Sequence, residues 1–178
     1  MMASTKHLFV ALSLPLLLAL ASPFPACAKN SEWEQLNKQS TVLYEQGDLE
    51  KAEETIKKAL ELAERTYGPE HPNVATSLNN LATLYLRQKR FQEVLPLIQG
   101  ALAIREKHFG YDHPSVAVSL GNLAAYYRAG SLTSVAEPLF RRALKIQQNT
   151  LGANHPITKE TQANLAQLIS AKQEHSKR

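Results

Sequence analysis

Three histidines stand at equal intervals in the chain, at His71, His113 and His155, and a proline directly follows each of them. Histidine is a common zinc ligand, and one zinc ion holds its nitrogen ligands at about 2.0 to 2.1 Å. Equivalent positions in successive helical units lie a whole unit apart, on the order of two interhelical distances of 8 to 10 Å. The three histidines therefore cannot share one ion. We expect no metal site here, and helix-entry and turn roles explain these residues.

The rest of the sequence offers no pattern typical of catalysis. The only cysteine is Cys27, and the chain lacks a Gly-x-Ser-x-Gly turn, a phosphate-cradling glycine loop and a His-Glu-x-x-His helix. Nothing places a base beside a nucleophile. We therefore predict no catalytic residues, no cofactor and no enzymatic activity, unless the chain is a subunit that completes the active site of another protein.

The first 28 residues have the layout of a secretory signal peptide. Lys6 and His7 form a short basic start, residues 8–20 form an apolar run, and Ala26, Cys27 and Ala28 supply small residues for cleavage. The run is too short to span a hydrocarbon core, which needs roughly 20 residues. Cleavage after Ala28 predicts an exported mature chain, periplasmic or secreted, with neither a cysteine nor a transmembrane segment. The alternative is a bacterial lipoprotein anchored through Cys27.

The pattern Gly-x-x-His-Pro occurs three times, at residues 68–72, 110–114 and 152–156. The same 42-residue interval separates three Asn-Leu-Ala triplets, at residues 80–82, 122–124 and 164–166. A fixed period of about 20 to 50 residues indicates a solenoid, in which each unit needs its neighbours to bury its apolar face. Such a stack offers a surface and seldom an enclosed reaction chamber.

Apolar residues between the repeated turns follow helical spacing, and no stretch alternates with the period of a strand. Two helices fit each period, because proline suits the first turn of a helix and glycine suits the residue after its end. The predicted helices are residues 32–46, 48–66, 72–89, 91–108, 114–129, 133–150 and 156–171. Small residues recur where helices would cross, at Ala59, Ala101 and Ala143 and at Ala82, Ala124 and Ala166.

The pattern Asn80-Leu81-Ala82-x-x-Tyr85, followed by a turn and by Phe91-x-x-Val94-x-x-Leu97-x-x-x-Ala101-Leu102, resembles the tetratricopeptide repeat (TPR). The 42-residue period, the Ala-Glu-Pro-Leu of residues 136–139 and the Gly-x-x-His-Pro linker resemble its kinesin light chain type. This implies an all-α TPR solenoid, a right-handed superhelix of antiparallel helix pairs with three repeats and a C-terminal capping helix. The implied division is a signal peptide at 1–28, a TPR domain at 29–171 and a polar tail at 172–178. Within the domain, the units are 32–70, 71–112 and 113–154, and the capping helix is 155–171.

In repeats of this kind the first helices of successive pairs line a concave groove that takes peptides or helices. The resemblance places the following residues in that groove: Asn37, Thr41, Tyr44, Thr76, Asn79, Thr83, Leu86, Arg87, Val118, Gly121, Ala125 and Arg128. Arg87 and Arg128 could hold a carboxylate through paired N–H bonds. The two-carboxylate clamp of chaperone-tail receptors is not expected, because of its residues only the second-unit asparagine, Asn80, is present.

The sequence therefore predicts an exported, non-enzymatic adaptor that binds a peptide or helix of another protein in this groove, with no nucleic-acid partner. Charge is unevenly spread: residues 29–70 hold ten acidic and six basic residues, and residues 71–178 hold six acidic and thirteen basic ones. This polarity could orient an acidic partner or favour head-to-tail association. The alternative function is accordingly a structural subunit of a self-associating or larger envelope assembly.

Overall fold

The computed structural model describes residues 25–176 of the 178-residue chain. Most of the predicted signal peptide, including Lys6 and residues 8–20, lies outside the described residues. Cys27 and the predicted cleavage residue Ala28 fall within the first helix.

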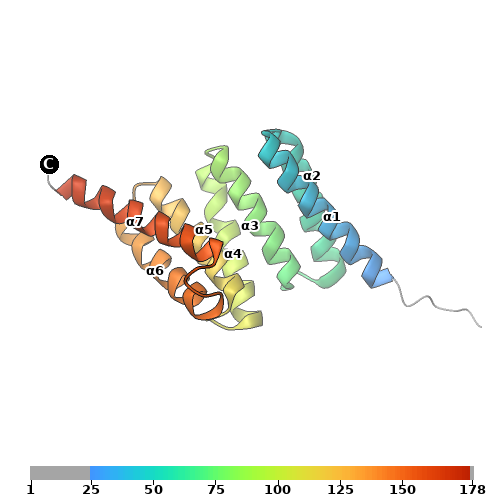
Figure 1. Cartoon of the computed structure of the whole chain (residues 1–178). Helices are drawn as coiled ribbons and strands as arrows, with labels where there is room; N and C mark the ends of the chain where they lie inside the picture. Colours follow the sequence, from blue (N-terminus) through green and yellow to red (C-terminus); the bar gives the residue numbers. More distant parts are fainter. Residues whose placement is uncertain (1–24, 177–178) are drawn as a thin grey trace, which may run out of the picture.

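The described residues form seven α-helices and no strand, arranged as three antiparallel pairs and a last single helix (Figure 1). The helices are α1 (Pro25–Gln46), α2 (Leu49–Tyr67), α3 (Pro72–Arg87), α4 (Phe91–Phe109), α5 (Pro114–Ala129), α6 (Thr133–Thr150) and α7 (Pro156–Ser176). The predicted all-α solenoid, with three pairs and a closing helix, is confirmed.

The two terminal helices are longer than predicted. Helix α1 begins at Pro25 rather than at residue 32, and α7 continues to Ser176, so most of the predicted polar tail is helical. Neither helix contains a glycine or proline after its first residue, and these are the residues that most often stop a helix. The inner helices, most of whose ends lie beside a glycine or proline, begin and end within two residues of the predicted positions.

The three repeated histidines are helix N-caps. Nδ1 of His71, His113 and His155 accepts a hydrogen bond from the backbone N–H two residues later, at 3.1, 3.2 and 3.3 Å. Each following proline is the first residue of its helix, where its missing N–H costs nothing. Two of the rings also stack on an aromatic residue: His71 on Tyr67 at 4.6 Å and His113 on Phe109 at 4.3 Å between ring centroids.

The glycine before each of these caps takes a backbone conformation that other residues avoid. Gly68 has φ of 86° and ψ of 160°, and Gly110 has φ of 82° and ψ of 169°. This is an extended conformation with positive φ, and it is essentially restricted to glycine. It turns the chain sharply from one helix pair into the next.

Small residues let the helices approach closely, as predicted, except at the end of the stack. Ala59, Ala101 and Ala143 and also Ala82 and Ala124 are fully buried, but Ala166 in α7 is exposed. The prediction for Ala166 was wrong because the alanine at this position packs against the second helix of its own pair. In the described part of the chain, α7 has no such partner.

The odd-numbered helices lie on the inner side of the stack. Each helix packs on the next in sequence, and in addition α1 contacts α3 and α3 contacts α5. Among the described residues, no comparably close contact joins α2 to α4 or α4 to α6. The stack therefore curves around α1, α3, α5 and α7, which form one face of the molecule (Figure 1).

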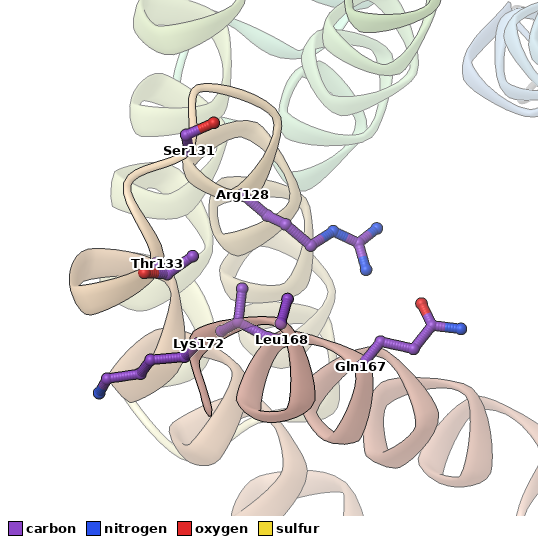
Figure 2. A pocket seen from close by; sticks show the side chains of 7 residues that line it. Arg128, Ser131, Thr133, Gln167, Leu168 and Lys172 are labelled. Atoms are coloured by element: carbon purple, nitrogen blue, oxygen red, sulfur yellow. The ribbon is translucent and has the colours of Figure 1, made fainter. Parts of the chain in front are cut away.

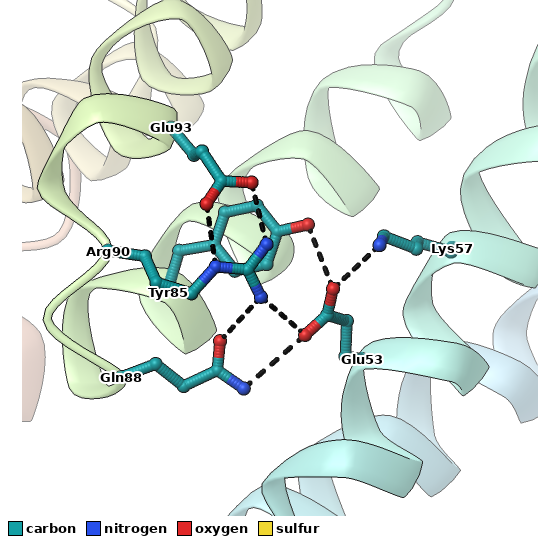
Figure 3. A network of polar contacts seen from close by, with 6 residues as sticks. All are labelled: Glu53, Lys57, Tyr85, Gln88, Arg90 and Glu93. Atoms are coloured by element: carbon teal, nitrogen blue, oxygen red, sulfur yellow. Dashed lines mark hydrogen bonds and ion pairs between the residues drawn. The ribbon is translucent and has the colours of Figure 1, made fainter.

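A polar network holds the first pair of helices against the second (Figure 3). The carboxylate of Glu53 in α2 accepts hydrogen bonds from Lys57, Tyr85, Gln88 and Arg90 at 2.6, 3.1, 3.4 and 2.7 Å. Burial by itself would raise the pKa of Glu53, but these hydrogen bonds outweigh it and hold the pKa at about 2. The Arg90 guanidinium also lies 3.8 Å from the centre of the Tyr85 ring.

Candidate functional site

The inner face carries three hollows, one in its N-terminal half and two in its C-terminal half. The first lies between α1 and α3, has a volume of about 190 Å³, and is lined by Thr41, Tyr44 and Thr83 among others. These three residues were all predicted to face the groove, and the structure brings them together. They present two hydroxyl groups and a phenol ring within one small depression.

Arg87 lies at the rim of this first hollow but is already engaged within the chain. Its Nη1 donates to the backbone carbonyl of Tyr44, and its guanidinium lies 4.6 Å from the centre of the Tyr44 ring. Its side chain is exposed. These contacts hold the positive charge of Arg87 in place at the edge of the groove. Because the side chain is already ordered, it would lose little conformational entropy on binding a carboxylate.

Between α3 and α5 the floor of the groove is filled by buried polar side chains. Arg105 of α4 is only 6% exposed and contacts no carboxylate among the described residues. It donates to the carbonyl of Ser115 at 3.1 Å, to Ser119 Oγ at 2.9 Å and to Thr76 Oγ1 at 3.3 Å. Burial lowers the pKa of Arg105 to about 10, so it remains charged at neutral pH. A cation with only neutral partners therefore lies directly under the groove.

The second hollow lies between α5 and α7 and has a volume of about 420 Å³. Its lining includes Val118, Gly121, Ala125 and Arg128, all predicted groove residues of the third unit. Arg128 donates to Asn164 Oδ1 at 2.9 Å and lies 5.8 Å from the centre of the Phe140 ring. The predicted groove residues of the third unit are thus brought together around one cavity.

Arg128 also borders the third hollow, of about 480 Å³, at the C-terminal end of the face. Figure 2 shows Arg128 and Gln167 pointing toward the same open space and Lys172 pointing away from it. Among the residues whose side chains are described, the lining contains two basic residues and no acidic one. Lys172 is paired with Glu137 at 2.9 Å, so Arg128 is the cation that a ligand would meet.

Four of the predicted groove residues are part of the scaffold. Asn37 and Asn79 are buried, at 8% and 2% exposure, and hydrogen-bond to neighbouring odd-numbered helices. Leu86 packs against the hydrophobic core. Thr76 is half-buried and serves as an acceptor for Arg105. These residues shape the groove from below.

Sequence reasoning missed the contributions of α6 and α7 to this face. Gln147 of α6 and Ile157, Glu160, Thr161 and Asn164 of α7 line the second hollow. The 42-residue interval could have revealed those in α7, since Glu160 and Asn164 correspond to Val118 and Asn122. The sequence analysis interpreted the last helix only as a cap. The structure shows that α7 also lines the groove, next to α5.

The described residues contain no group of three or more His, Cys, Asp or Glu side chains placed to hold a metal ion. None of the described helices is both long and apolar enough to cross a membrane. Fold and site together define a helical repeat protein with an open, hollowed inner face.

A model of the tetratricopeptide repeat family matches residues 35–107 and 86–147. Together these matches span more than half of the chain, and the chain belongs to the tetratricopeptide repeat family. Proteins of this family are in general non-enzymatic scaffolds with protein partners. No curated protein matches the sequence.

Solved structures with the same fold include two with a TM-score of 0.72. One is BtubC (BKLC) from P. vanneervenii, at 23% identity, covering 84% of this chain and 59% of that chain. The other is a Podosopora anserina protein described as a kinesin light chain with nearly identical TPR-like repeats, at 26% identity, covering 83% of this chain and 70% of that chain. The kinesin light chain type of repeat is thereby confirmed. The chain spans about 59% of the length of BtubC.

Proposed function

We propose that this protein is an exported adaptor that binds a peptide or helix of a partner protein along the face formed by α1, α3, α5 and α7. The observation that carries the proposal is that three hollows and two positioned arginines, Arg87 and Arg128, share this one face. The hollows offer space for ligand side chains. The hydroxyl, amide and guanidinium groups around them offer partners for a peptide backbone and for acidic side chains.

A peptide display library panned against the purified chain tests this proposal. We expect enriched peptides to share at least one acidic residue, and the double variant Arg87→Glu plus Arg128→Glu to lose at least about tenfold in affinity for them. The reason is that a hydrogen bond to a charged group contributes about 1.5 to 3 kcal/mol, and the variant reverses both charges.

The matched control is Lys58→Glu plus Lys145→Glu, which makes the same change in net charge on α2 and α6, away from the groove. Both lysines are exposed. Melting temperatures of both double variants show whether either one is unfolded. Equal loss of binding in a folded control, or undiminished binding in the groove variant, would reject the groove as the binding surface.

The alternative function, a subunit that assembles through the ends of the stack, has less support at the C-terminal end. The α7 positions that correspond to Ala117, Leu120 and Ala124 of α5 are Lys159, Gln162 and Ala166, all exposed. A face with lysine and glutamine in place of alanine and leucine offers little apolar area for stacking. Light scattering after size-exclusion chromatography separates the two functions: the adaptor is expected to be a monomer, and a concentration-dependent oligomer would favour the subunit.

Export is the part of the proposal that depends on the sequence alone. We expect mass spectrometry of the protein recovered from its native compartment to give Lys29 as the first residue. A diacylated N-terminal Cys27 would instead indicate a lipid anchor, and an intact N-terminus in that compartment would contradict cleavage.

A further inference from the structure

One position of the inner groove differs sharply between the units: it is Asn37 in α1, Asn79 in α3 and Gly121 in α5. Asn37 Oδ1 accepts a hydrogen bond from Asn80 at 3.0 Å, and Asn79 Nδ2 donates to Ser119 Oγ at 2.9 Å. Each asparagine thus fills the space between its own helix and the next odd-numbered helix. Gly121 has no side chain that could do the same.

Gly121 leaves open space between α5 and α7. A Cβ atom at this position would have no neighbouring atom within 4 Å, and φ of Gly121 is not in the left-handed region. Helix α1 contacts α3, and α3 contacts α5. Within the described residues, α5 and α7 contact each other less extensively. The backbone does not require glycine here, and the missing side chain enlarges the hollow of about 420 Å³ that Gly121 lines.

The floor of this hollow is the carboxamide of Gln147, the α6 residue that corresponds to Arg105 in α4. Gln147 is 3% exposed, and its Oε1 is buried with no hydrogen-bond partner among the described residues. Buried polar groups in folded proteins are nearly always paired. Gln147 lines the hollow, so its unpaired amide is a group with which a ligand in the hollow can pair once the amide turns toward it.

The charges around the hollow favour an uncharged ligand group. Among the lining residues only Arg128 and Glu160 ionise, one of each sign. Arg128 already donates to Asn164 at 2.9 Å. An ammonium or carboxylate group that entered the hollow would lose its hydration. It would meet one charge of its own sign and one of the opposite sign, so the free-energy cost of desolvation would not be offset.

A carboxamide fits this combination of groups. It carries two N–H donors and a carbonyl acceptor, so it can pair with the amide of Gln147 in either orientation of that amide. Its aliphatic stem would pass the side chains of Val118 and Ile157, which form apolar walls. A purely apolar side chain would fill the space but leave Gln147 unpaired.

We propose that the hollow at Gly121 is a specificity pocket for an asparagine or glutamine side chain of the bound peptide. This inference rests on the proposed function, because it assigns one side chain of the ligand that the groove binds. It also makes Gly121 the specificity-determining residue, since an asparagine here would occupy the pocket as Asn37 and Asn79 occupy theirs.

The first test compares peptides enriched by the wild-type chain with those enriched by Gly121→Asn. The wild type is expected to select asparagine or glutamine at one fixed position, and the variant is expected to lose this preference while still binding peptides. Ala103→Asn, which adds an asparagine on the exposed surface of α4 outside the groove, is the matched control and should keep the preference. Enrichment without an amide at any fixed position, or the same preference in Gly121→Asn, would overturn the assignment.

A second test does not depend on peptide binding, so it separates failure of the pocket from failure of the proposed function. Propionamide, propionate and propylammonium are titrated into ¹⁵N-labelled protein while amide chemical shifts are recorded. Propionamide is expected to shift the signals of Gly121, Gln147 and Thr161, the two ions to shift them far less, and Gly121→Asn to abolish the effect without lowering the melting temperature. Shifts of equal size for the ions, or none for propionamide, would contradict the proposal.

Discussion

The carboxylate of Glu53 contributes stability that depends on pH. Its pKa is held at about 2 in the folded chain, against an ordinary value of 4.5, although burial alone would raise it. The hydrogen bonds to this carboxylate are therefore strongest when it is ionised. Their contribution is fully present above pH 4.5 and is lost as the pH falls from 4.5 toward 2.

We expect Glu53→Gln to lower the free energy of unfolding at pH 7 by up to about 3 kcal/mol. The variant should also show a weaker loss of stability than the wild type between pH 4.5 and 2. Urea denaturation followed by circular dichroism at several pH values measures both effects. Glu54→Gln, which removes an exposed partner of Lys58, is the control and should change little. Parallel pH profiles for Glu53→Gln and the wild type would show that the network does not hold the carboxylate ionised.

The histidine caps allow the N-cap hydrogen bond and the aromatic stack to be measured separately. His155 caps α7 and stacks on no aromatic ring in the described part of the chain, because Leu151 stands where Phe109 stacks on His113. We expect His155→Ala to destabilise the chain by about 0.5 to 2 kcal/mol, as loss of an N-cap does, and His113→Ala to cost more. Asparagine at either position should restore the cap alone. Thermal unfolding shows which alanine variant is less stable. If both lost the same stability, the ring contact between Phe109 and His113 would contribute nothing.

The roles of single residues were only partly predictable. The helix-entry role of the three histidines follows from local chemistry, since each precedes a proline at the start of a helix. The burial of Asn37 and Asn79 does not, because it depends on how closely neighbouring helices approach. A hydrogen bond across forty residues, such as that from Asn79 to Ser119, leaves no local signal in the sequence.

Helix crossings give matched pairs of substitutions at the scale of whole elements. Ala101 is fully buried in α4, and Ala103, two residues further on, is exposed. We expect Ala101→Leu to cost about 1 to 3 kcal/mol through overpacking and Ala103→Leu to be nearly neutral. Melting temperatures check this, and equal effects would contradict the observed orientation of α4.

A second pair tests the position of α7 at the end of the stack. Ala124 in α5 and Ala166 in α7 occupy equivalent positions, but only Ala124 is buried. Ala124→Leu should therefore lower the melting temperature by several degrees and Ala166→Leu should not. If Ala166→Leu were equally damaging, the outer face of α7 would have to be covered in solution.

Helix number and order were predictable because the 42-residue period repeats the signals that start and stop a helix. Helix length at the two ends was not, because α1 and α7 lack an internal glycine or proline on the side where the prediction ended them. The alanine pattern also failed at α7, since a period alone does not show where the last partner helix is missing.

Stability should vary along the stack. The inner helices α3, α4 and α5 pack against neighbours on both sides, whereas α1 and α7 do so on one side only. Repeat proteins gain much of their stability from contacts between adjacent units. We expect hydrogen exchange, followed by mass spectrometry, to be slowest in α3 to α5 and fastest in α1 and α7. Uniform protection, including α7, would indicate that the chain opens only as one cooperative unit.

The whole-molecule fold was the most predictable feature, since a repeat constrains every unit at once. The chemistry of the groove was less so, because it depends on the positions at which the units differ. Equivalent positions on the even-numbered helices hold Ala63, Arg105 and Gln147. That these side chains are buried beneath the inner face depends on how the helices pack, which the sequence alone does not show.

The unequal junctions between the odd-numbered helices also bear on how the molecule bends. Asn37 and Asn79 bridge the first two junctions, and the Glu53 network clamps the first pair of helices to the second. At the third junction Gly121 has no bridge to offer, and α7 is held across the inner face by the bond from Arg128 to Asn164. We therefore expect the stack to bend most easily at α7, so that its curvature adjusts at the C-terminal end to the width of a bound ligand.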